Sequence, residues 1–187
     1  MSAYDVIVVG GGHAGAEAAH ASARMGCRTL LLTLNPDRIG YMSCNPAIGG
    51  LAKGQLVKEV DALGGIMARV TDRAGIQYRR LNESKGPAVR SSRVQCDKAR
   101  YALEMQALLR GVPGLEIGIG EASALDVEGE RIRALVLADG TRLETRAVVI
   151  TSGTFLKAIM HTGEKQESGG RAGDAAAQGL SGALQNL

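Results

Sequence analysis

Residues 5–15, DVIVVGGGHAG, decide the fold that the sequence predicts. The stretch begins with a short run that is mostly β-branched, which is typical of a buried parallel strand. Gly10, Gly12 and Gly15 then match the pattern G-x-G-x-x-G. In that pattern the first glycine allows a tight turn, the second lets the backbone approach a pyrophosphate, and the third permits close packing of a helix on the strand. The stretch therefore predicts the first turn of a dinucleotide-binding unit.

The residues that follow complete a βαβ unit. Residues 14–25 are rich in small helix formers, and Gly26 is placed to end that helix. Residues 28–34 form a second apolar run that suits a strand. The N-terminus of the helix would offer free N–H groups and the positive end of its dipole to phosphates. Strand, turn, helix and strand together favour a bound nucleotide over a glycine-rich turn without a ligand.

The rest of the chain predicts an α/β fold with a central parallel sheet and a small antiparallel meander. Residues 35–50 hold two prolines and three glycines and predict no regular structure. Apolar residues at helical spacing predict helices near residues 56–63 and over residues 92–110. Residues 115–119 and 147–151 predict core strands, and residues 169–187 are glycine-rich and then helical. Residues 122–146 predict the meander, because Glu128-Gly129 and Asp139-Gly140 separate apolar runs.

Composition indicates an ordinary soluble, cytoplasmic protein. The 187 residues are 45% hydrophobic and 22% charged, and the net charge of +3 is too small to indicate a nucleic-acid binder by itself. Aromatic residues make up 3%, which disfavours an aromatic platform for single-stranded nucleic acid. Three cysteines without CxxC spacing indicate reduced thiols. No basic leader, cleavage site or long apolar span is present, and the three histidines lack metal-ligand spacing, so we expect neither a membrane anchor nor a metal.

The ribose end of the expected cofactor site departs from the usual pattern. An acidic residue that binds the ribose should end the second strand, but that position is Thr33. Thr33 and Asn35 point the same way on a strand and could hydrogen-bond a ribose hydroxyl without charge. No basic residue replaces the acid, so the sequence does not support a 2′-phosphate cofactor. His13, inside the glycine loop, is most simply read as a surface residue near the first helical turn.

Cys44 is the candidate reactive group. It lies in M-S-C-N-P-A-I-G-G, directly after the βαβ unit and before a helix that carries Lys53. A thiolate is favoured near a helix N-terminus or a cation, whereas a buried cysteine is inert, and the spacing alone favours neither. Cys27, at the helix–strand junction, and Cys96, inside a predicted helix, are expected to be packing residues.

Residues 79–100 form a basic segment. It carries seven Lys or Arg against two acidic residues, a local charge of +5. Such a cluster can hold phosphates or an RNA backbone, although a solvated basic face is the better interpretation from the residues alone. The candidate contacts are Arg79, Arg80, Lys85, Arg90 and Arg93.

Five blocks together resemble one family. They are G-G-G-H-A-G, M-S-C-N-P-A-I-G-G, K-G-P-A-V-R-S-S-R-V-Q-C-D-K, T-S-G-T-F-L and S-G-G-R-A-G-D, in that order. The family is the tRNA uridine carboxymethylaminomethyl-modifying flavoprotein, also called glucose-inhibited division protein A. The resemblance implies a cytoplasmic FAD enzyme with a glutathione-reductase-type fold that modifies the wobble uridine of tRNA. It also implies NADH as reductant, methylene-tetrahydrofolate as carbon donor, a homodimer and a GTPase partner.

The resemblance assigns roles by motif. Cys44 matches a family cysteine that takes part in catalysis, and the basic segment would lie near the flavin and the tRNA. The FAD contacts that the resemblance and the loop together imply are Gly10, Gly11, Gly12, His13, Ala14, Gly15, Thr33, Asn35, Ala122, Gly153 and Ser168.

The chain is shorter than members of that family. We therefore expect residues 1–187 to be the N-terminal part of an FAD-binding domain, without the family's NAD-binding insert and helical C-terminal domain. Such a part is expected to bind FAD weakly or not at all and not to modify tRNA by itself. Two alternatives stay open, namely a short module that binds FAD or RNA without catalysis and a related folate-dependent tRNA methyltransferase flavoprotein.

Overall fold

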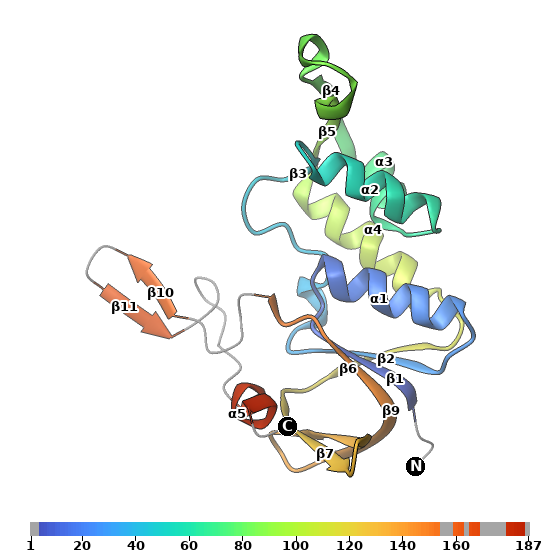
Figure 1. Ribbon diagram of the computed structural model, residues 1–187, viewed down its shortest axis with the longest axis vertical. Helices are drawn as coiled ribbons and strands as arrows, with labels where there is room; N and C mark the ends of the chain where they lie inside the picture. The colour runs from blue at the N-terminus through green and yellow to red at the C-terminus, as the bar shows by residue number, and fades with distance from the viewer. Residues whose placement is uncertain (1–3, 154–158, 163–164, 169–178, 186–187) are drawn as a thin grey trace.

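A six-stranded sheet forms the centre of the computed structural model, which describes residues 4–153, 159–162, 165–168 and 179–185 (Figure 1). Its strand order is β6-β2-β1-β9-β8-β7. The first four strands in this order are parallel, and the last two run antiparallel to their neighbours. Their bounds are β1 Tyr4–Val9, β2 Thr29–Thr33, β6 Leu115–Ile119, β7 Ala122–Glu128, β8 Arg131–Leu137 and β9 Arg142–Ile150.

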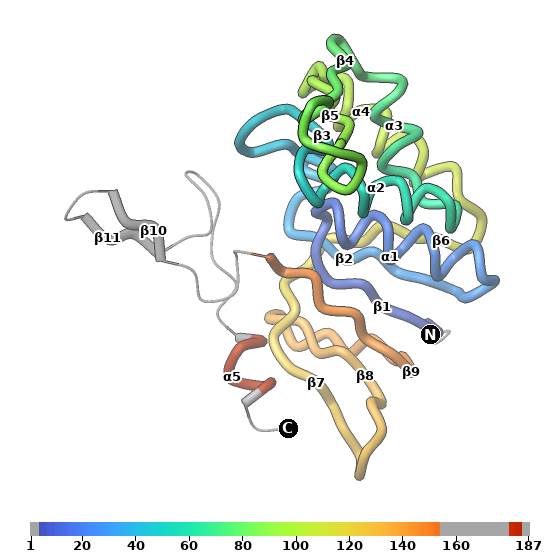
Figure 2. Tube along the Cα trace, turned by 45° about the horizontal axis from the view of Figure 1, so that its top comes forward, coloured from blue at the N-terminus to red at the C-terminus, as the bar shows by residue number. Residues whose placement is uncertain are grey.

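Helices α1 (His13–Arg24) and α4 (Lys98–Arg110) cover one face of this sheet. Two further helices, α2 (Lys53–Ala62) and α3 (Met67–Ala74), lie farther out, where α3 packs on α4 and α2 packs on α3. Figures 1 and 2 both show α1 lying against β1 and β2. Fully buried Val8 and Leu31 of the sheet pack there with Ala16, Tyr101 and Met105 of the helices.

The opposite face of the sheet has a core of its own. Ile7, Leu30 and Leu32 pack there against buried residues of β7 and β8 and against Leu180. Leu180 belongs to α5 (Gly179–Gln185). Because alternate residues of β1 and β2 face opposite cores, residues 6–9 of β1 and 30–32 of β2 are all apolar, as the sequence predicts for buried parallel strands.

The register of the sheet brings three strand ends to one edge. Val9 of β1 is paired with Leu32 of β2 and with Ile150 of β9. The chain therefore leaves all three strands at the same edge, where the glycine loop, Thr33 and Thr151 follow. This carboxyl edge is where parallel α/β sheets bind ligands.

A second, three-stranded sheet projects beyond the helices at the upper end of Figure 1. Its order is β3-β5-β4, with β3 at Ala47–Gly49, β5 at Ser91–Cys96 and β4 at Gly75–Leu81. Short 3-10 turns lie at Pro36–Arg38, Glu83–Lys85 and Pro87–Val89. A separate hairpin pairs β10 (Ile159–Thr162) with β11 (Lys165–Ser168).

Most predicted elements are confirmed. The βαβ unit is present, α1 ends before Gly26 at φ 86°, and the meander turns at both predicted Gly-containing sites. The third meander strand and the predicted strand over residues 147–151 are one strand, β9, which joins the two halves of the sheet. The predicted helix over residues 56–63 exists as α2, yet Leu56 and Leu63 are 59% and 88% exposed.

Two predictions are wrong. Residues 92–96 are strand, and the helix starts only at Lys98, because Asp97 caps it by accepting a hydrogen bond from the Arg100 N–H at 2.9 Å. Val94 matched the helical stripe by chance. Residues 35–50 are partly regular, because Ala47–Gly49 pairs with β5 in spite of Pro46. The sequence analysis also missed β4.

Candidate functional site

The glycine turn after β1 is held tightly by its surroundings. Gly10 has φ 111°, and a Cβ there would lie 2.6 Å from the carbonyl oxygen of Thr151. At Gly15 a Cβ would lie 1.8 Å from the carbonyl oxygen of Gly10. Gly11 is also enclosed, since a Cβ would meet Thr33 Oγ1 at 3.0 Å. Three of the glycines are thus required by the packing of turn, helix and neighbouring strand ends.

Gly12 differs from these three glycines. It is exposed, and a Cβ built on it would meet no atom within 4 Å. Its φ of −70° is accessible to any residue, so neither strain nor crowding inside the chain requires glycine here. Gly12 is the N-cap of α1, which receives no side-chain capping hydrogen bond. Open space beside uncapped N–H groups fits a pyrophosphate at this helix N-terminus.

Thr151 fastens the turn from the neighbouring strand. Its hydroxyl lies 2.8 Å from the carbonyl oxygen of Val9 and 3.1 Å from that of Gly10, and can donate to either. Its N–H donates to Val9 as well. The sequence analysis missed this residue, because only the parallel pairing of β9 with β1 brings it to the loop. Its place as the last residue of the predicted core strand over residues 147–151 was the one signal available.

The residues expected at the ribose are both engaged locally. The buried Thr33 hydroxyl lies 3.4 Å from the carbonyl oxygen of Asn35, and the Asn35 Oδ1 accepts the Asp37 N–H at 2.9 Å. Of the other predicted contacts, Ala122 is buried at the start of β7, and exposed Gly153 follows β9 with φ 57°. Ser168 ends β11. Ribose and flavin contacts by these residues stay predictions.

His13 is half-buried rather than a surface residue. Its ring centroid lies 5.6 Å from that of Tyr101, at an interplanar angle of 42°. Tyr101 is fully buried in α4, and burial raises the pKa of its hydroxyl. His13 therefore ties the first turn of α1 to α4, while Ala14 beside it is exposed.

Two cations flank Tyr41 beside the glycine turn. Arg38 Cζ and Lys98 Nζ lie 4.5 and 4.7 Å from its ring centroid. Lys98, and to a lesser degree Arg38, lowers the pKa of the Tyr41 hydroxyl. The preceding residue, Gly40, donates its N–H to the carbonyl of Gly11 at 3.0 Å. This positive group was not predicted, because Lys98 is distant in sequence.

Cys44 lies on an exposed loop between Gly40 and β3. The hydroxyl of Ser43 lies 3.9 Å from its sulfur. The helix that carries Lys53 does not follow directly, because β3 comes first. Cys96 is 2% exposed, and burial raises the pKa of its thiol, which confirms it as a packing residue. Cys27 is half-buried at the junction of α1 and β2.

The basic residues lie together on the projecting hairpin. Arg79 and Arg80 are on β4, Lys85 and Arg90 are near its tip, and Arg93 is on β5. Among the described residues none of the five forms an ion pair with a carboxylate, although five other arginines do.

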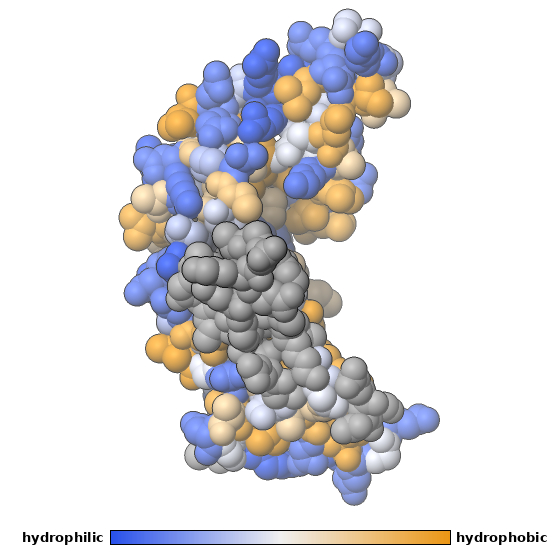
Figure 3. Space-filling view, turned by 90° about the vertical axis from the view of Figure 1, so that its left-hand side faces the viewer, coloured by the Kyte–Doolittle hydropathy of each residue, from blue (hydrophilic) through white to orange (hydrophobic). Residues whose placement is uncertain are grey.

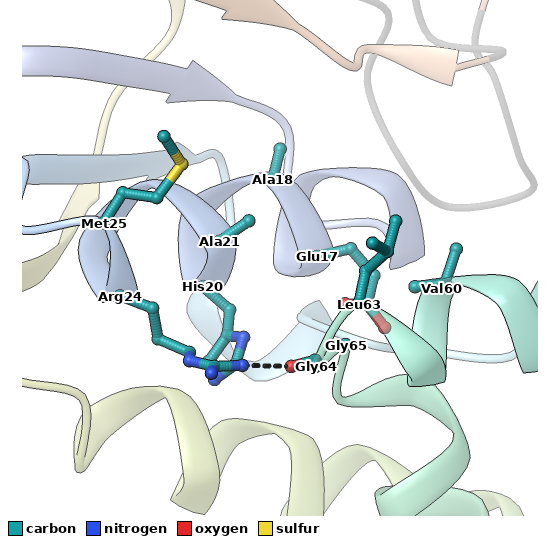
Figure 4. Close-up of a pocket in the computed structure, with 10 residues that line it drawn as sticks. All are labelled: Glu17, Ala18, His20, Ala21, Arg24, Met25, Val60, Leu63, Gly64 and Gly65. Atoms are coloured by element: carbon teal, nitrogen blue, oxygen red, sulfur yellow. Dashed lines mark hydrogen bonds between the residues drawn. The ribbon is translucent and has the colours of Figure 1, made fainter.

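A surface pocket lies away from the glycine turn (Figure 4). It runs between the later turns of α1 and the connection from α2 to α3, and none of the predicted site residues lines it. Its side chains are structural. Arg24 donates to the Gly64 carbonyl at 2.7 Å, and the Glu17 carboxylate accepts the N–H groups of Ile66 and Met67, which begin α3.

The described residues contain neither a metal-binding group nor a membrane-spanning helix. In the part of the chain that the structure describes, no three His, Cys, Asp or Glu side chains are grouped to hold a metal ion. The described helices are all too short or too polar to cross a membrane.

Fold and turn together define a Rossmann-type α/β protein with a dinucleotide cradle at the carboxyl edge of its sheet. The chain belongs to the family described as Glucose inhibited division protein A, whose model matches residues 5–187. A relative from Myxococcus xanthus, the tRNA uridine 5-carboxymethylaminomethyl modification enzyme MnmG, is 56% identical over 98% of this chain and 30% of its own length. The chain thus spans about a third of the length of the curated relatives it matches.

Solved structures agree with that assignment. GidA of Aquifex aeolicus superposes with a TM-score of 0.95 at 45% identity, over 99% of this chain and 31% of that one. The GidA-related protein of Thermus thermophilus superposes with a TM-score of 0.70 at 24% identity, over 99% of this chain and 68% of that one, and shows the shared fold.

Proposed function

We propose that the chain is the FAD-binding part of a flavoenzyme that installs a carboxymethylaminomethyl group on the wobble uridine of tRNA. The observation that carries this proposal is the open, uncapped N-terminus of α1 at Gly12, in a chain of this family. Bound FAD would supply hydride transfer. The chain's own residues bind and orient it.

The cradle assigns separate tasks to its residues. The backbone around Gly12, His13 and Ala14 holds the pyrophosphate, while Gly10, Gly11 and Gly15 let the turn close. Thr33 and Asn35 lie where the ribose would be, since the end of β2 adjoins the end of β1. Further flavin contacts come from Ala122, Gly153 and Ser168.

The remaining components belong to the whole protein. We place the NAD-binding insert and the helical partner-binding domain in the two thirds of the relatives' length that this chain does not span. NADH would reduce the flavin, methylene-tetrahydrofolate would supply carbon, and a GTPase would assist a cytoplasmic homodimer. The candidate tRNA contacts are Arg79, Arg80, Lys85, Arg90 and Arg93.

Flavin binding tests the proposal. We would compare this chain with a chimaera in which residues 1–187 replace the matching segment of the Myxococcus xanthus relative. The chimaera should purify with flavin absorbance and modify tRNA, whereas the chain alone should bind FAD weakly or not at all. A folded chimaera without flavin would refute the proposal. Full flavin occupancy in the chain alone would contradict the expectation for the segment.

Cys44 is proposed to take part in catalysis, because its thiol is exposed on the loop that leads away from the cradle. Cys44→Ser in the chimaera should abolish tRNA modification and leave the flavin content unchanged. Cys27→Ser is the matched control and should keep both. Wild-type modification by Cys44→Ser would remove Cys44 from the chemistry.

A further inference from the structure

The small sheet has two faces of different character. Ile48 of β3 and Val94 of β5 are register partners and pack against the core. Tyr78 is the partner of Val94 on β4 and donates its hydroxyl to the carbonyl of Asp72 in α3 at 3.2 Å. Because side chains alternate along a strand, the residues on either side of these three belong to the opposite, outer face.

The outer face carries two matched cross-strand pairs. Arg79 is directly opposite Arg93, and Gln77 is directly opposite Gln95. On β3 the same rows continue with Gly49 and Ala47, which are small and leave the face flat. We call this set of six residues the outer platform. Arg79 and Gln77 are exposed, and Arg93 and Gln95 are half-buried.

The arginine pair is unfavourable for the chain by itself. Like charges directly opposite on neighbouring strands destabilise a sheet. No carboxylate among the described residues lies within 4.0 Å of either arginine to offset the repulsion. A phosphate bound between the two arginines would offset this repulsion.

The hairpin is already ordered around the platform. Arg90 donates its Nε–H to the carbonyl of Glu83 at 3.0 Å, and Asn82 donates to Val89 at 3.2 Å. Gln55 of α2 lies 3.3 Å from the carbonyl of Arg90. The Arg90 side chain therefore stabilises the loop of the hairpin. Because Arg80 follows Arg79 on β4, its side chain lies on the opposite face of the small sheet. The basic residues of the hairpin are not equivalent.

We infer that the outer platform binds one unpaired nucleotide of an RNA, with Arg79 and Arg93 on its phosphate and Gln77 and Gln95 on the edge of its base. This inference rests on the proposed function. The two pairs are separated by two residues, about 7 Å along the strands, which suits a phosphate with its attached base rather than a single small anion. Glutamine amides both donate and accept, as base edges require.

The platform also lies close to Cys44 along the chain. Only three peptide units separate Cys44 from Ala47, so their Cα atoms are at most about 11 Å apart. Figure 3 shows hydrophilic and hydrophobic residues side by side at the end of the molecule where the hairpin lies. RNA held on the platform would thus present its neighbouring nucleotides to the loop that carries the thiol.

Fluorescence anisotropy with a labelled tRNA anticodon stem–loop tests the inference, on the chain and on the chimaera. The double variant Arg79→Met/Arg93→Met should lose roughly tenfold or more in affinity per arginine. Its salt dependence should fall by about 0.7 to 0.9 in log–log slope per lost phosphate contact. Arg131→Met, an exposed arginine at the start of β8 and far from the hairpin, is the matched control and should change affinity less than threefold.

Thermal unfolding separates binding from a structural role. Removing the like-charge pair should leave the unfolding midpoint of the double variant unchanged or raise it, whereas a structural role would lower it.

Gln77→Ala/Gln95→Ala should reduce the preference for the cognate anticodon loop over a scrambled one without changing the salt dependence of binding. An equal loss for Arg79→Met/Arg93→Met and for Arg131→Met would overturn the inference, while the flavin proposal would stand. Failure of the unsubstituted chimaera to bind RNA would refute both the inference and the tRNA part of the proposed function.

Discussion

Gly15→Ala should destabilise the fold, whereas Gly12→Ala should leave its stability nearly unchanged and weaken flavin binding. A Cβ at residue 15 would lie 1.8 Å from the Gly10 carbonyl oxygen and 2.7 Å from Thr151 Oγ1. The first of these is backbone, so α1 would have to move away from the turn. Overpacking costs about 1–3 kcal/mol, and we expect the upper end. With a Tm change of about 2–4 °C per kcal/mol for a domain of this size, Gly15→Ala should lower the Tm by about 6–12 °C.

Gly12→Ala should be nearly neutral for folding. The added Cβ meets no atom within 4 Å, and φ −70° with ψ −175° suits alanine. Alanine is a poorer N-cap than glycine by several tenths of a kcal/mol, while its stiffer unfolded chain stabilises the fold by about 0.4–1 kcal/mol. These contributions offset one another, so the Tm should change by less than about 2 °C.

Gly12→Ala should nevertheless lower the affinity for FAD, although it hardly changes the stability of the fold. The methyl group would occupy the space through which the pyrophosphate approaches the N–H groups of α1. Loss of one or two charge-assisted hydrogen bonds corresponds to roughly tenfold or more in affinity. Circular dichroism melts of the chain and FAD titrations of the apo-chimaera would measure the two effects. Wild-type FAD affinity in Gly12→Ala, or a wild-type Tm in Gly15→Ala, would refute the packing argument.

Three further results are expected. Glu17→Gln should destabilise the chain by about 1–3 kcal/mol in chemical denaturation, because it weakens the charged acceptor for the first N–H groups of α3; an unchanged midpoint would contradict this. Burial lowers the pKa of His20 below 6.5, so its contribution to stability is complete above that pH and is lost as the pH falls through its folded pKa. His20→Gln should flatten this acid-side loss in melts from pH 7 to 5. In spectrophotometric titration Tyr41 should ionise before Tyr4 and Tyr101, and Lys98→Met should raise the Tyr41 pKa; no shift would rule out the contact.

The parts of the fold that local signals encode were predictable from the sequence. The glycine turn, α1 and the meander each depend on residues within a few positions, such as Gly26 at the helix end and Asp139-Gly140 at a hairpin turn. Their physical causes are backbone conformations that glycine adopts readily. The family assignment followed from motifs of the same local kind.

Non-local pairing explains what could not be predicted. β4 carries Arg79 and Arg80 and leaves most of its side chains exposed, so it lacks the apolar pattern of a core strand. Val94 fitted the helical pattern because Tyr101 follows it at seven residues, which is two helical turns. The structure shows instead that Val94 is in a strand and that Tyr101 is in a helix whose N-cap is Asp97. Sheet register brings Thr151 to the site, and helix packing brings Lys98 there. Neither arrangement can be predicted from a single sequence.

The short connections from Cys44 to two anchored residues restrict its position more than any local contact does. Gly40 donates its N–H to the carbonyl of Gly11 in the cradle, and Ala47 at the start of β3 is part of the outer platform. Four and three peptide units separate Cys44 from these two anchors, so its Cα lies within about 15 Å of one and about 11 Å of the other. Both anchors are tied to regular structure, so the exposed thiol stays within reach of both the cradle and the platform whatever path the loop takes. A reactive group shared by a flavin site and an RNA site needs that position, and a buried packing cysteine does not.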